Sequence, residues 1–164
     1  ALERASPMAT LGRLIQEDLC VMQRYGSQHV LTAAVLCFPA SWTLAEKIGH
    51  PLSDIHIPVA SYTEDLAKRV QRLFDAIHQD RPLWRSNCLW YDSPDLFQPD
   101  PRPASVASLN SDLGAGQGTY LRSERQCLLR LPKTQAVVFS IHTYVLKAAA
   151  ARQLMLSSGQ SVQP

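Results

Sequence analysis

The sequence predicts an α+β domain in which an antiparallel sheet carries helices packed on one side. Three observations support this class. Residues 30–38 are almost continuously apolar, residues 83–92 alternate as a strand does, and residues 119–131 and 135–146 read as two strands joined by a short turn. Apolar residues at helical spacing elsewhere supply the helices. We expect the 164 residues to form a single domain.

The first half of the chain is expected to contribute three helices and one strand. Apolar residues recur at helical spacing over residues 8–25, which predicts an amphipathic helix. Residues 30–38 suit a strand that is covered on both faces, and we place it at the centre of the sheet. A short capped helix over 42–49, a loop over 51–61 and a long amphipathic helix over 62–77 follow.

The second half is expected to hold the rest of the sheet. After the strand at 83–92, residues 94–118 are rich in Pro, Ser, Asp and Gly, which predicts a long mobile loop. The strands at 119–131 and 135–146 flank a three-residue turn and should pair antiparallel. An Ala-rich tail from Lys147 could form a last helix with a frayed end.

Composition excludes several classes of function. The net charge of +2 leaves no basic stripe for nucleic acid, and no apolar stretch is long enough to cross a membrane. We therefore expect a soluble, cytoplasmic protein. There is no dinucleotide-binding glycine pattern after a strand and no nucleophile elbow, so neither flavin or NAD(P) binding by this chain nor hydrolysis is supported. The four cysteines stand singly and are expected to be reduced.

His56 is the histidine in the most unusual setting. It lies between Ile55 and Ile57 in an apolar loop that contains proline, where an imidazole without a partner would be costly. A hydrogen bond to Asp54 or to the backbone would satisfy it, and so would an axial bond to haem iron. His142 lies inside the last strand, where it either packs across the sheet or lines whatever the sheet covers.

A polar cluster is predicted on one strand. Alternation puts Arg122, Glu124 and Gln126 on one face and Arg125 on the other. This cluster is either the solvated face of an edge strand with an ion pair, or a fixed charge cluster that binds a carboxylate, an ammonium group or reduced oxygen. Arg85 and Asn87 share one face of the strand at 83–92. They too are either part of a solvated strand face or part of a fixed polar site.

Several short motifs, taken in order, resemble a known family. They are Cys37-Phe38-Pro39-Ala40-Ser41-Trp42, Leu44-Ala45-Glu46-Lys47-Ile48-Gly49, Ile55-His56-x-Pro58-Val59, Arg85-Ser86-Asn87, Tyr120-Leu121-Arg122-Ser123-Glu124-Arg125-Gln126, Arg130-Leu131-Pro132 and Thr143-Tyr144. Together they span about residues 17–146. Over this span the chain resembles the haem-dependent oxidative N-demethylase alpha-subunit-like proteins.

The resemblance implies a PAS-like domain that binds b-type haem. It implies a monooxygenase-type oxidoreductase that uses O2 to convert a small secondary amine, of the dimethylamine type, to a primary amine and formaldehyde. NADPH would supply electrons through FMN and 2Fe-2S centres on partner reductase subunits. The alternatives are a haem-binding sensor or binding module of the same fold without turnover, and a degenerate member whose pocket is filled by its own side chains.

The resemblance also suggests roles for individual residues. His56 would be the axial ligand of the iron, and Arg122 and Glu124 would form the polar site around oxygen and amine. Arg85, Asn87 and His142 would line the cofactor.

Two departures from the family pattern matter. The pattern has Pro-Val-Pro-Gly-Tyr where this chain has residues 58–62, and a Trp where it has Cys88. We expect the first change to loosen the loop that carries His56 and the second to enlarge a pocket wall.

Overall fold

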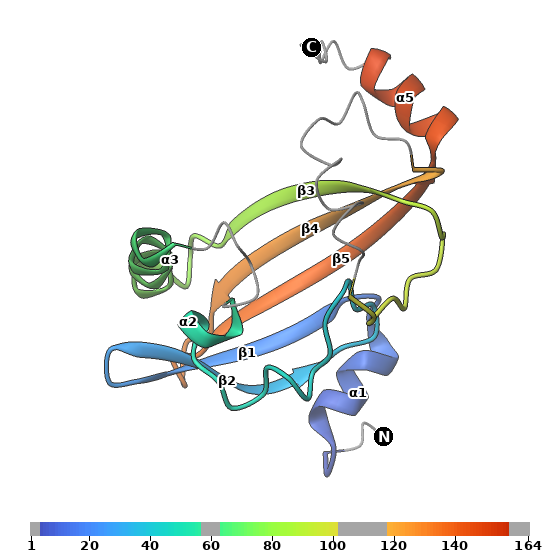
Figure 1. Cartoon of the computed structure of the whole chain (residues 1–164). Helices are drawn as coiled ribbons and strands as arrows, with labels where there is room; N and C mark the ends of the chain where they lie inside the picture. Colours follow the sequence, from blue (N-terminus) through green and yellow to red (C-terminus); the bar gives the residue numbers. More distant parts are fainter. Residues whose placement is uncertain (1–3, 57–62, 102–117, 158–164) are drawn as a thin grey trace.

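The computed structural model describes residues 4–56, 63–101 and 118–157. In this part of the chain, five strands form one antiparallel sheet in the order β2-β1-β5-β4-β3, accompanied by helices (Figure 1). The elements in chain order are α1 (Pro7–Leu14), β1 (Asp18–Tyr25), β2 (Gln28–Val35), α2 (Leu52–Ile55), α3 (Glu64–Ala76), β3 (Leu83–Tyr91), β4 (Tyr120–Arg130), β5 (Val137–Lys147) and α5 (Ala148–Ser157). The predicted α+β class is confirmed. No helix among the described residues is long and apolar enough to span a membrane.

The second half of the chain folds largely as predicted. Strand β3 pairs with β4 along its whole length, and β4 pairs with β5 as an antiparallel hairpin. The Ala-rich tail forms α5. Residues 102–117 of the predicted loop and the predicted frayed end from residue 158 lie outside the described residues.

The predicted helix over residues 8–25 is confirmed only for residues 8–14 and is wrong for the remainder. Helix α1 ends at Leu14, Ile15 is extended, and residues 18–25 form β1, which pairs with β2 on one side and β5 on the other. Gly26, with a φ of 58°, lies in the β1–β2 turn. The apolar spacing of this segment fits a helix by coincidence, because a strand buried on both faces needs no polar alternation.

Two further expectations for the first half need correction. Residues 42–49 form turns rather than a helix, and Gly49 and His50 bond to the backbone of Leu31 instead. Strand β2 is an edge strand, not the centre of the sheet. The two corrections are linked. The turn at residues 42–49 covers the free edge of β2 with backbone of the same chain, so an apolar strand can lie at this edge of the sheet.

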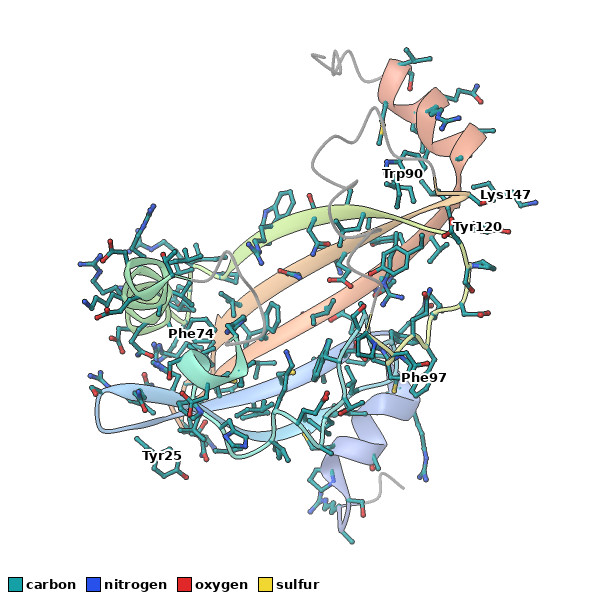
Figure 2. All side chains as sticks on the ribbon, in the orientation of Figure 1. Tyr25, Phe74, Trp90, Phe97, Tyr120 and Lys147 are labelled. Carbon is teal, nitrogen blue, oxygen red and sulfur yellow. The ribbon has the colours of Figure 1, made fainter. Side chains whose placement is uncertain are left out.

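The main core lies between one face of the sheet and the helices α2 and α3. Phe74 projects from α3 toward the sheet, where it joins Met22, Leu31 and Val137 (Figure 2). Helix α5 instead packs at the far end of the sheet, where Ala151 meets Trp90 and Leu121. Leu121 alternates with the cavity-facing residues of β4, so α5 covers the opposite face and the helices are not confined to one side.

Arg130 fixes the position of α3 over the sheet. It lies at the end of β4 and donates hydrogen bonds to the carbonyl oxygens of Phe74 and Ile77, each at 2.6 Å. These carbonyls are at the C-terminal end of α3, where backbone acceptors lack partners within the helix and a cation is favourable. A residue of the sheet thereby holds the helix that roofs the cavity described next.

Candidate functional site

A cavity of about 710 Å³ lies between the sheet and the segments that cover it. Its floor comes from strands β1 to β5, and its roof from α2, α3 and residues 38–47. Most of the lining is apolar. The polar and titratable residues in it are Asp18, Cys20, Lys47, His56, Arg85, Glu124 and Gln126. The size and the mixture of many apolar walls with a few polar groups are typical of cofactor and small-ligand sites.

His56 lines this cavity directly after α2. Its Nδ1 lies 2.8 Å from the carbonyl oxygen of Leu52. Because a carbonyl can only accept, Nδ1 carries the hydrogen and Nε2 is the basic nitrogen of the neutral ring. Burial lowers the pKa of His56 below its usual value, and Lys47 and Arg85 lower it further. The ring is therefore held neutral in one tautomer, which is the form that binds a metal.

Cys20 also lines the cavity and is the other candidate for an iron ligand. Burial raises the pKa of its thiol to about 12, and the neighbouring Asp18 adds to this effect. A thiol must lose its proton to become a strong ligand, and here the thiolate would form in an apolar site beside a carboxyl group. His56 needs no such change, so the structure favours His56 over Cys20 as a ligand.

Arg122 ties together the segments around the cavity. It is 2% exposed and donates to the carbonyl oxygens of Phe38 at 2.6 Å and Leu96 at 3.0 Å. Its Nε lies 3.4 Å from Glu124 Oε1. Since β4 lies inside the sheet between β3 and β5, the interpretation of this cluster as a solvated edge strand is wrong. Arg125, on the other face, pairs with Glu17 at the surface.

Glu124 is the centre of a polar network on the cavity floor. Its Oε2 accepts hydrogen bonds from Asn87 at 3.3 Å and Gln126 at 3.1 Å. Gln126 in turn accepts from Arg85 Nε at 2.8 Å. The network follows from strand register, because Asn87 is opposite Glu124 and Arg85 is opposite Gln126. Four of the predicted site residues, Arg85, Asn87, Arg122 and Glu124, are thus brought together.

Asp18 is a cavity residue that the sequence reasoning missed. It is 1% exposed, and its Oδ1 accepts hydrogen bonds from the backbone N–H groups of Cys37 at 2.6 Å and Phe38 at 2.9 Å. Burial is the main reason that its pKa is raised, and the charge on Glu124 raises it further. The two carboxyl groups are therefore close enough to interact, and both face the cavity.

Comparison with known protein families gives a match for almost the whole chain. The model described as haem-dependent oxidative N-demethylase, alpha subunit-like, matches residues 1–158. The chain belongs to this family.

Most of the family-like motifs have structural explanations around the cavity. The Cys37–Trp42 motif supplies backbone groups that form hydrogen bonds with Asp18 and Arg122. Ala40 of this motif forms an isolated β-bridge with Gln98. The Arg130 motif holds α3. The family motifs are therefore spread along the chain but gather around one site.

Two residues that were expected at the cavity from the resemblance to the N-demethylase-like family, His142 and Cys88, lie elsewhere. His142 is on the opposite face of the sheet, 3.7 Å from Glu17 and in a tilted ring contact with Tyr144, so it does not line this cavity. Cys88 is also on that face and packs with Trp90 beneath α5. The expectation that Cys88 enlarges the pocket wall is therefore wrong. The other departure, at residues 58–62, lies outside the described residues.

Proposed function

We propose that this chain binds b-type haem in the cavity, with His56 as the axial ligand, and serves as the haem subunit of an oxidative N-demethylase. The observation that carries the proposal is the state of His56, a neutral imidazole fixed by Leu52 on the wall of a large, mostly apolar cavity. Imidazole is a common protein ligand of haem iron. The PAS-like architecture and a cytoplasmic location belong to the same proposal.

The cavity suits haem in size and chemistry. Its volume of about 710 Å³ lies within the range of roughly 300–1,000 Å³ typical of ligand sites. Leu31, Val70, Phe74 and Phe139 are among the apolar side chains that would contact the ring. When bound, haem would supply the capacity to reduce O2, which no side chain of the described residues provides.

The acidic groups of the cavity suit a small ammonium substrate. A secondary amine is protonated at neutral pH, and Glu124 and Asp18 offer carboxyl groups to hold it. Arg122 fixes one oxygen of Glu124, so that the carboxylate is oriented before the amine arrives. Burial raises the pKa of Asp18, so its carboxylate is a stronger base than that of an exposed aspartate, which suits it to take a proton from the ammonium group.

The proposed reaction consumes one secondary amine, one O2, one NADPH and one proton. It yields a primary amine, formaldehyde, water and NADP⁺. One C–H bond of an N-methyl group and then the C–N bond break, and one oxygen atom of O2 ends in formaldehyde and the other in water. We propose that the two electrons from NADPH arrive through FMN and 2Fe-2S centres on partner subunits. The description of the family as alpha subunit-like supports the existence of partner subunits.

The test of haem binding is a titration of the purified protein with haem, followed by absorption spectra of the oxidised and reduced forms. We expect a strong Soret band in the wild type and in His78→Ala, a control that removes an exposed histidine that does not line the cavity. His56→Ala should lose or shift the band, and adding imidazole should restore much of it. A His56→Ala spectrum identical to that of the wild type would refute the assignment of the ligand.

Turnover separates an enzyme from a haem-binding sensor. The haem-loaded protein is supplied with NADPH, a surrogate flavin and iron–sulfur reductase, O2 and dimethylamine, and formaldehyde is measured. The paired carboxyl groups favour the enzyme, because a haem sensor has no need of an ammonium site. Formaldehyde that depends on the amine and falls strongly in Glu124→Gln supports this reading. Tight haem binding without any formaldehyde production would instead support a haem-binding sensor or binding module.

A further inference from the structure

Lys47 is a cation on the cavity wall that the site described above does not use. It is half-buried, and its Nζ lies 3.4 Å from the carbonyl oxygen of Ile55 and 4.9 Å from the centre of the Trp42 ring. Its neighbour Glu46 turns away, because that carboxylate accepts hydrogen bonds from the backbone and hydroxyl of Thr43. Among the described residues no carboxylate lies within 4.0 Å of Lys47.

Arg85 is the second such cation. Its Nε donates to Gln126, but it has no carboxylate partner in the described part of the chain, and its guanidinium group reaches the same cavity. Lys47 comes from the turn above the sheet and Arg85 from β3 in the floor, so the two approach the cavity from different elements. Both lower the pKa of His56, which places the two positive charges within electrostatic range of the same imidazole.

Different charged groups act on Asp18 and on His56, although Asp18 and Lys47 both act on Cys20. Glu124 and Arg122 are the charged groups that act on Asp18, whereas Lys47 and Arg85 are those that act on His56. A ligand that binds beside His56 therefore meets two positive charges that, among the described residues, have no carboxylate within 4.0 Å, and this part of the cavity is suited to a ligand that carries negative charge next to an apolar body.

We propose that Lys47 and Arg85 bind the two carboxylates of haem. The proposal rests on the function proposed above and names the groups that orient the cofactor. Haem b carries both of its carboxylates on one edge of an otherwise apolar ring. Charge-assisted hydrogen bonds to a half-buried cation are stronger than those between neutral groups. The carboxyl groups of Asp18 and Glu124 would repel the same edge, so the charges select one orientation of the ring.

The experiment compares two porphyrins, haem and haem dimethyl ester, which lacks the negative charges. Each is titrated into the wild type, Lys47→Met, Arg85→Met and Lys47→Arg, and binding is followed by the Soret band. Lys68→Met is the matched control, because Lys68 is an exposed lysine paired with Glu64 on the outer side of α3. We expect each methionine variant of a cavity cation to weaken haem binding roughly 10- to 100-fold and to leave ester binding unchanged. Lys47→Arg should retain most of the affinity for haem.

The outcomes separate this inference from the proposed function. If Lys47→Met and Arg85→Met weaken both porphyrins equally, these residues only pack in the wall and the inference is overturned. If the wild type binds haem and its ester equally well and the variants change neither, haem binding stands and the inference again falls. If the wild type binds neither porphyrin, both proposals fall together. A selective loss of haem affinity in the two variants, absent in Lys68→Met, supports the inference.

Discussion

Arg122→Met should be among the most destabilising single substitutions in this chain. The side chain is 2% exposed and donates to two backbone carbonyls from segments far apart in sequence, Phe38 and Leu96. It also pairs with Glu124 and contacts the hydroxyl of Thr143 at 3.4 Å. Methionine keeps much of the apolar volume but removes every donor, so the change tests the polar contacts rather than the packing.

The expected loss of unfolding free energy in Arg122→Met follows from the buried groups that would lose their partner. Removing one member of a buried ion pair costs about 3–5 kcal/mol, because the remaining charge stays buried. Glu124 keeps its hydrogen bonds from Asn87 and Gln126, which reduces this cost. Each abandoned carbonyl adds about 1–3 kcal/mol where water cannot reach it. Since these terms are not additive, we expect a loss of about 4 kcal/mol, a large part of a typical domain's stability of about 5–15 kcal/mol.

The assay is urea unfolding followed by tryptophan fluorescence and circular dichroism. Arg125→Met is the matched control, because Arg125 lies on the opposite face of β4 and its side chain, which is 48% exposed, pairs with Glu17 at 3.0 Å. An exposed pair of this kind contributes less than about 1 kcal/mol. Adding Glu124→Gln to Arg122→Met should restore part of the loss. If Arg122→Met and Arg125→Met cost the same, Arg122 is not the buried clamp described here. Should Arg122→Met fail to fold, Arg122→Lys provides an intermediate value.

Three further predictions use the same unfolding assay. Asp18→Ala leaves two backbone N–H groups without an acceptor and should cost about 2–5 kcal/mol, whereas Asp18→Asn keeps an acceptor without a buried charge and should cost less than about 1 kcal/mol; equal losses would contradict this. Gly118→Ala would put a Cβ 2.8 Å from the backbone N and O of Tyr91 and should cost about 1–3 kcal/mol; an unchanged midpoint would show that the strand ends move apart freely. Burial lowers the pKa of His29 below 6.5, so the unfolded state takes up a proton at a higher pH than the folded state does, and stability should fall as the pH drops below about 6.5. In His29→Asn the loss of stability with falling pH should be smaller. An identical pH profile in this variant would show that His29 is not the source of the pH dependence.

The parts of the fold that the sequence predicted well are those set by local periodicity. Strands β3, β4 and β5 alternate or run as apolar segments between clear turns, and α3 has a single apolar stripe and a Thr63 cap. Alternation also put Arg122 and Glu124 on one face correctly. What alternation could not give was the register between strands. That register makes Asn87 a partner of Glu124 and Arg85 a partner of Gln126, and it turns separate polar residues into one network.

The errors have a common cause in the first half of the chain. A fully buried strand and a buried helix are both apolar, so the spacing in residues 8–25 did not separate them, and Asp18 was thereby placed on a helix instead of on the sheet. The useful signal was the turn at Tyr25-Gly26-Ser27 between two apolar runs, which indicates a hairpin. Likewise, the predicted helix over residues 42–49 gave no indication that Lys47 reaches the cavity, whereas the actual turn brings Lys47 there while Glu46 accepts a hydrogen bond from Thr43.

The separation of charges links the fold to the proposed reaction. A small ammonium ion and a cofactor with two carboxylates would attract each other in water and bind in any order or orientation. In the proposed arrangement the carboxyl groups of Asp18 and Glu124 would attract the first and repel the second, while Lys47 and Arg85 would do the reverse. Because the groups belong to different strands and to a turn of fixed geometry, the cofactor and the amine should occupy distinct places before any electron arrives. The rates of haem uptake and of amine binding should consequently respond to different substitutions, which a single undivided polar pocket would not allow.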